Sequence, residues 1–158
     1  MNHTTNYQGW TLPGHQPASE VPAVAAHLGP RARKHFFEAT AYLMQGETVS
    51  GVWEGAAWGD DNGKDHSALG VLVVTDRRLI ACGAGLGVRV NRQMLLVDVT
   101  GADFRRDALR LTELSGAMVV TGRGGYELKF APSAGSHVAQ QLAGWILALR
   151  HHVESTRR

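Results

Sequence analysis

Residues 72–80 have the sequence LVVTDRRLI, in which two short apolar runs lie on either side of a polar turn. We expect an antiparallel hairpin here, with the first apolar run facing the second across the strand pair. Asp76 lies at the turn, where its carboxylate can accept hydrogen bonds from nearby backbone N–H groups and fix the reversal. Arg77 and Arg78 should then point to opposite faces of the hairpin. Turn formation explains Asp76 and Arg77 without a ligand, so we expect both to have a structural role.

The chain around this hairpin consists of short β-like segments separated by turn residues. The candidate strands are Thr48–Trp58, Ser67–Thr75, Arg78–Ala84, Gly87–Arg92, Leu95–Asp103, Ala108–Glu113, Ala117–Thr121 and Tyr126–Phe130. Val71–Val74 is continuously apolar, as expected for a strand that is covered on both faces. A meandering antiparallel sheet of this length must close or pack on itself to hide its edges.

A helical pattern precedes the strands. Ser19 can cap a short helix that ends at Gly29, and a second helix is expected from Pro30 to about Leu43. This second helix is amphipathic, so its apolar face needs a surface to cover. That surface is either the sheet of the same chain or another copy of the protein, and the sequence leaves both alternatives open.

A second amphipathic helix is expected after Pro132, capped by Ser133 or Ser136. Its apolar side carries Val138, Leu142, Trp145, Leu149 and Val153. A closed sheet leaves an opening at one end that exposes apolar side chains, and a long amphipathic helix at the end of the chain can cover this opening. We therefore expect Trp145 to fill most of the opening.

Several segments resemble the bacterial pleckstrin-homology-like (bPH) and GRAM-like domain family. The hairpin over residues 72–80 is similar to its LVLTDRRLI motif, and Gln45–Val49 is similar to the GE-x-V start of its first strand. Leu96–Asp103 resembles its DITGVD strand, and Gly124–Phe130 resembles its last strand. The resemblance covers roughly residues 43–153. It implies a mainly β fold, a bent antiparallel barrel of about seven strands capped by a C-terminal helix.

These patterns divide the chain into three parts. We expect a flexible tail over residues 1–18, an N-terminal helical extension over residues 19–44 and the PH-like domain over residues 45–156. The N-terminus carries neither a basic nor an apolar targeting segment, and its apolar runs are too short to span a membrane. We therefore expect a cytoplasmic protein.

Arginine dominates the cationic residues, with 13 Arg against 3 Lys, but the formal net charge is only +2. This charge is too small to indicate a nucleic-acid-binding protein. The charge is unevenly distributed, however: residues 77–110 contain 7 Arg and 3 Asp, a balance of +4. Residues 44–66 contain 5 acidic residues and 1 Lys, a balance of −4.

Within the basic segment, Arg89, Arg92, Arg105 and Arg106 form a candidate interaction or anion-binding surface. Guanidinium groups can bind phosphate head groups or the carboxylates of an acidic protein. Alternatively, the basic and acidic segments could form patches that meet between copies in a head-to-tail assembly. Members of the bPH family resemble assembly modules at least as often as lipid binders. We therefore expect a protein-interaction or homo-oligomeric module, with peripheral binding to anionic lipid as the alternative.

The sequence contains no recognisable pattern for catalysis, metal binding or a cofactor. Cys82 is the only cysteine and lies in an apolar run, where a buried and inert thiol is expected. The eight histidines show no metal-binding spacing, and Asp60–Asp65 lacks the spacing of a calcium loop. We therefore expect a non-enzymatic protein without a metal or cofactor.

Overall fold

The computed structural model describes residues 10–11, 25–41, 43–61, 64–85, 87–106 and 116–156. Their elements are β1 (Trp10–Thr11), α1 (Pro30–Thr40), β2 (Thr48–Asp61), β3 (Lys64–Thr75), β4 (Arg78–Gly85), β5 (Val88–Leu95), η2 (Leu96–Asp98), β6 (Val99–Arg105), β7 (Ala117–Gly122), η4 (Arg123–Gly125), β8 (Glu127–Pro132) and α2 (Ser136–Thr156). The predicted tail and first short helix fall largely outside the described residues, and so does the candidate strand Ala108–Glu113. Of these segments the structure describes β1, which pairs with the start of β2, and residues 25–29, where Ala25 and Leu28 are buried.

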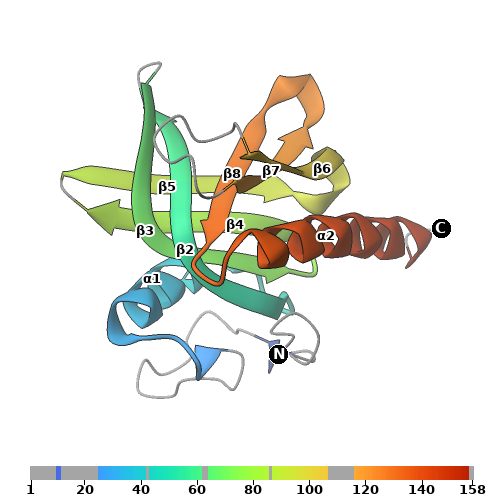
Figure 1. Ribbon diagram of the computed structural model, residues 1–158. Helices are drawn as coiled ribbons and strands as arrows, with labels where there is room; N and C mark the ends of the chain where they lie inside the picture. Colours follow the sequence, from blue (N-terminus) through green and yellow to red (C-terminus); the bar gives the residue numbers. More distant parts are fainter. Residues whose placement is uncertain are drawn as a thin grey trace.

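The described strands form one curled antiparallel sheet in the order β5-β4-β3-β2-β8-β7-β6, with β1 pairing with β2 off this path (Figure 1). β2 pairs with β3 along most of its length, and over Gly55–Trp58 it also pairs with β8. A Cβ atom at Gly55 would collide with the carbonyl oxygen of Ala131 in β8. Glycine therefore allows β2 and β8 to approach closely. Their pairing joins the two halves of the sheet, β5-β4-β3-β2 and β8-β7-β6.

The hairpin between β3 and β4 has the predicted pairing, with Val73 opposite Ile80 and Val74 opposite Leu79. Its turn is fixed by a residue other than the expected one. The hydroxyl oxygen of Thr75 accepts hydrogen bonds from the backbone N–H groups of Arg77 and Arg78, both at 3.0 Å.

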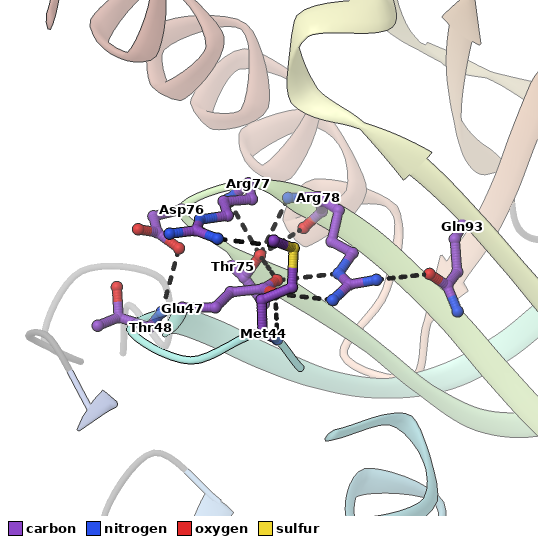
Figure 2. Close-up of polar contacts among 8 residues, drawn as sticks. All are labelled: Met44, Glu47, Thr48, Thr75, Asp76, Arg77, Arg78 and Gln93. Atoms are coloured by element: carbon purple, nitrogen blue, oxygen red, sulfur yellow. Dashed lines mark hydrogen bonds and ion pairs between the residues drawn. The ribbon is translucent and has the colours of Figure 1, made fainter. Parts of the chain in front are cut away.

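Asp76 instead joins this turn to the start of β2. Its carboxylate accepts a hydrogen bond from the Thr48 N–H at 3.1 Å, and its own N–H donates to the Thr48 carbonyl at 3.0 Å (Figure 2). Asp76 therefore has a structural contact, but to a strand that lies far away in the sequence.

The inner face of the curled sheet and α2 enclose the main hydrophobic cluster. Trp53, Leu72, Leu79 and Phe130 are among its buried strand residues, and α2 contributes Ala139, Leu142, Ala143 and Ile146. The predicted bent antiparallel sheet with a C-terminal helix packed against it is confirmed. Burial of these apolar side chains is the main force that holds α2 in place.

Trp145 lies at the border of this cluster and not at its centre. It is partly buried and packs edge-to-face against Trp53, with ring centroids 5.5 Å apart. Leu142 and Ile146 of the same helix are fully buried instead. The apolar stripe of α2 is therefore centred about one residue away from the predicted line.

The outer face of β2, β3 and β4 carries a second hydrophobic cluster, and α1 covers it (Figure 1). Phe36 of α1 is fully buried against this face, which includes Val71 and Val73. The continuous apolar run in β3 is thus covered on both faces, as predicted. Of the two alternatives for α1, the structure shows the first: its apolar face packs on the sheet of the same chain.

The predicted strand Leu95–Asp103 is interrupted, and this prediction is wrong in detail. β5 continues to Leu95, a 3-10 turn follows over Leu96–Asp98, and β6 begins at Val99. The side chain of Leu96 is fully buried in the main cluster, so the turn holds the chain in the core while it passes from one half of the sheet to the other.

No helix of the described residues is long and apolar enough to cross a membrane.

Candidate binding surface

Arg92 and Tyr126 form the centre of a polar surface at the gap between β5 and the turn before β8. Arg92 donates a hydrogen bond from Nε to the Tyr126 hydroxyl at 2.8 Å, and its guanidinium carbon lies 4.5 Å from the centre of the tyrosine ring. The turn preceding Tyr126 needs glycine, because Gly124 and Gly125 have φ angles of 76° and 80°. The contact between Arg92 and Tyr126 holds the guanidinium group and the aromatic ring in one orientation at the surface.

Three adjoining hollows surround Tyr126, a residue that is 37% exposed. The first, of about 420 Å³, is lined by Arg78, Gln93, Met94, Leu95, Asp98, Gly122, Arg123 and Tyr126. The second, of about 470 Å³, is lined by Trp58, Arg92, Gly124, Gly125, Tyr126, Glu127 and Lys129. The third, of about 460 Å³, is lined by Gly59, His66, Arg89, Val90, Asn91, Arg92 and Tyr126. We refer to the residues of these three hollows as the Tyr126 surface.

The Tyr126 surface has more cationic than anionic side chains. Arg89, Arg92, Arg123 and Lys129 contribute four positive charges, and Asp98 and Glu127 contribute two negative charges. Arg78 also lines this surface, but its charge is balanced by Glu47. Arg123 lies 3.7 Å from Asp98, and their side chains are 73% and 39% exposed, so solvent weakens this ion pair. The surface as a whole therefore favours an anionic ligand.

Arg78 differs from the other arginines because a buried carboxylate holds it. The Glu47 side chain is fully buried and accepts two hydrogen bonds from Arg78, from Nε at 2.9 Å and from Nη2 at 2.7 Å (Figure 2). Arg78 also donates from Nη1 to the Gln93 side chain at 3.0 Å. This network supports the wall of the first hollow and cancels the charge of Arg78 there.

The same network keeps Glu47 ionised. Burial alone would raise the pKa of Glu47, but hydrogen bonds from Arg78, from the Thr75 hydroxyl and from the Met44 N–H outweigh it and hold this pKa below its usual range. The Glu47 carboxylate in turn raises the pKa of Arg78 above its already high ordinary value. Both groups are therefore charged at neutral pH.

The structure does not gather the four predicted arginines in one place. Strand alternation puts Arg92 on the inner side of β5, together with the buried Val90 and Met94, and Arg89 on the opposite side. The two line the third hollow together because they lie at the free edge of the sheet.

Arg105 lies on the outer face of β6, where it donates hydrogen bonds to Asp103 and Glu127, each at 3.2 Å. Arg106 follows it and is exposed. A role for Arg105 and Arg106 in binding stays a prediction.

The two acidic residues of the segment 44–66 whose side chains the structure describes both have contacts within the chain. Glu47 is buried against Arg78, and Glu54 accepts a hydrogen bond from the Gly29 N–H at 3.1 Å. The side chains of Asp60, Asp61 and Asp65 lie outside the described residues. Two of the five acidic groups therefore have structural contacts within the chain and are unavailable to an acidic patch.

Sequence reasoning missed Tyr126 and Trp58 as surface residues. Tyr126 was expected to be part of the last strand and Trp58 part of the first. The glycine-rich turn directly before Tyr126 was a usable signal, because it places Tyr126 next to a turn at the end of a strand.

No family model and no curated protein matches the sequence. The C-terminal domain of an unknown protein from Leishmania infantum is 14% identical, with a TM-score of 0.48 over 75% of this chain and 93% of that chain.

Two further structures contain pleckstrin-homology domains. The DH/PH domains of PDZ-RhoGEF, solved in a complex with GTP-gamma-S activated RhoA, are 9% identical with a TM-score of 0.43. The DH/PH domains of another RhoGEF are 8% identical with a TM-score of 0.44. This chain spans 37% and 33% of those two chains.

Proposed function

We propose that this protein is a non-enzymatic, cytoplasmic binding module of the bPH/GRAM-like type, which binds an acidic segment of another protein at the Tyr126 surface. The observation that carries the proposal is the second hollow, where Trp58, Tyr126 and Arg92 lie together. Tryptophan, tyrosine and arginine are the residues that contribute most to binding energy in protein interfaces.

The geometry of Arg92 supports this use. Because Tyr126 already orders the Arg92 side chain, a partner that binds the guanidinium loses less side-chain entropy than it would at a free arginine. The guanidinium groups of Arg89 and Arg123 extend the cationic lining on either side, so an extended acidic segment could contact several charges in succession.

The chemistry of the lining supports binding rather than catalysis. In the described part of the Tyr126 surface, no nucleophile is hydrogen-bonded to a general base, which covalent catalysis requires. Homo-oligomeric assembly by opposite charge patches is less well supported, because Glu47 and Glu54 are occupied within the chain.

Display of a random peptide library, selected on the purified full chain, tests the proposal. We expect the enriched peptides to be rich in Asp and Glu and to bind at least about tenfold more weakly to Arg92→Ala and Tyr126→Ala, which lose buried interface contacts. Arg150→Ala, on α2 beyond this surface, is the matched control and should bind like the wild type. No enrichment of acidic peptides, or equal binding by all variants, would reject the proposal.

Two further measurements separate the alternatives. Co-sedimentation with vesicles of neutral lipid, with and without phosphatidylserine, identifies anionic-membrane binding if the anionic vesicles alone retain the protein. Light scattering after size exclusion identifies self-association. Either result, in the absence of acidic-peptide binding, would replace the proposed partner.

A further inference from the structure

Three side chains with metal-binding atoms converge between α1 and β4. They are His35 and Glu38 of α1 and Cys82 of β4, and one potential ligand atom from each lies within 4.8 Å of the other two. The His35 Nδ1 and the Glu38 Oε2 are 3.4 Å apart. Imidazole nitrogen, carboxylate oxygen and thiolate sulfur are the three ligand types that bind zinc in proteins.

The fold places these side chains on rigid elements. His35 and Glu38 are three residues apart, so they lie on the same face of α1. Phe36 is fully buried in the second hydrophobic cluster, on the outer face of the sheet, and Cys82 belongs to the same cluster. This packing fixes α1 over β4. The positions of the three ligand atoms therefore depend on core packing and not on a loop.

Burial and charge also favour a cation at this position. His35 is 5% exposed and Cys82 is 6% exposed, whereas the side chain of Glu38 is 35% exposed. A divalent cation bound to one thiolate, one carboxylate and one neutral imidazole forms a unit without net charge, which costs less to bury than its separate ions. Glu38 is the most solvent-exposed of the three residues.

We propose that His35, Glu38 and Cys82 bind a divalent cation of the zinc class, with water as the fourth ligand. On binding, the metal–sulfur bond replaces the S–H bond of Cys82, and the proton passes to solvent. Zinc bonds of about 2.0–2.3 Å in a tetrahedral site put ligand atoms about 3.5 Å from one another. The observed separations therefore need only small side-chain rotations to close on one ion.

Titration of the purified, chelator-treated full chain with Co²⁺ tests this site, because four-coordinate Co²⁺ absorbs visible light and a bound thiolate adds a near-ultraviolet charge-transfer band. We expect both signals to saturate at one Co²⁺ per chain and to disappear on addition of Zn²⁺. Cys82→Ser should abolish the charge-transfer band. His35→Ala and Glu38→Gln should each weaken Co²⁺ binding by more than about tenfold.

The control tests whether exposed histidines, which can bind metal ions nonspecifically, account for the spectrum. His151 and His152 are adjacent and exposed on α2, and their joint replacement by Ala should leave the Co²⁺ spectrum unchanged. An unchanged spectrum in Cys82→Ser, or a spectrum lost in the His151/His152 variant, would overturn the proposal. So would the absence of any charge-transfer band in the wild type.

Stability provides a second measurement if a substitution weakens folding. We expect Zn²⁺ to raise the urea midpoint of the wild type and to leave that of Cys82→Ala unchanged, because a ligand that binds the folded state stabilises it. An equal rise in both proteins would place the ion elsewhere. This site is independent of the Tyr126 surface, so failure of one proposal leaves the other standing.

Discussion

The ion pair between Glu47 and Arg78 gives the sharpest test of the energetics of this fold. Glu47 is fully buried, the Arg78 side chain is 15% exposed, and their shortest contact is 2.7 Å. Arg78→Met keeps most of the side-chain volume but removes the guanidinium, which leaves a buried carboxylate without its cation. Such a change costs about 3–5 kcal/mol.

Arg105→Met is the matched control on the other half of the sheet. The Arg105 side chain is 43% exposed, and its partners Asp103 and Glu127 are 64% and 36% exposed. Water screens these pairs, so their loss should cost no more than about 1 kcal/mol. The two variants differ mainly in whether the carboxylate left behind can be hydrated.

Urea unfolding followed by tryptophan fluorescence measures both variants on one scale. The double variant Glu47→Leu/Arg78→Met should recover much of the stability lost by Arg78→Met, because it removes the unpaired charge as well as the cation. If Arg78→Met destabilises the protein no more than Arg105→Met does, the carboxylate of Glu47 is not held as described, and the reasoning is refuted.

Three further predictions concern the ionisation of Glu47 and the packing of the two helices. Because the pKa of Glu47 is lower in the folded state, its contribution to stability is complete above its unfolded pKa of about 4.3 and is lost as pH falls through the folded value. Urea midpoints of the wild type and Glu47→Gln should therefore converge in acid, and a constant difference would contradict this. Trp145→Ala should lower the free energy of unfolding by about 2 kcal/mol and Leu142→Ala by about 3 kcal/mol, because Trp145 is only partly buried. The reverse order in urea unfolding would show that Trp145 is the main contact of α2 with the sheet. Phe36→Ala should cost about 3–5 kcal/mol, and a loss below about 1 kcal/mol by the same method would show that α1 is not anchored to the sheet.

The fold was predictable from sequence because its signals are local. Apolar residues that alternate or run continuously, such as Val71–Val74, identify strands, and turn residues separate them. The interruption at Leu96 was not predictable from this pattern, since the apolar run continues through Leu95, Leu96 and Val97. Only the passage of the chain between the two halves of the sheet requires a turn there.

The candidate site was less predictable because its contacts join distant segments. Arg92 meets Tyr126 at a separation of 34 residues, and Arg78 meets Glu47 at a separation of 31. Composition identified a basic segment, but strand alternation then sent Arg89 and Arg92 to opposite sides of β5. Charge counting along the sequence cannot detect this division. It also cannot show that Glu47 is buried with Arg78.

The most direct test of the central claim, that the Tyr126 surface is the binding surface, is an NMR titration. Amide shifts of the ¹⁵N-labelled full chain would be followed as an Asp- and Glu-rich peptide is added, with a Gln- and Asn-substituted peptide as the control. We predict saturable shifts concentrated in β5 and from η4 to the start of β8, absent with the neutral peptide. Shifts confined to the outer face near α1, or no shifts with the acidic peptide, would contradict the account.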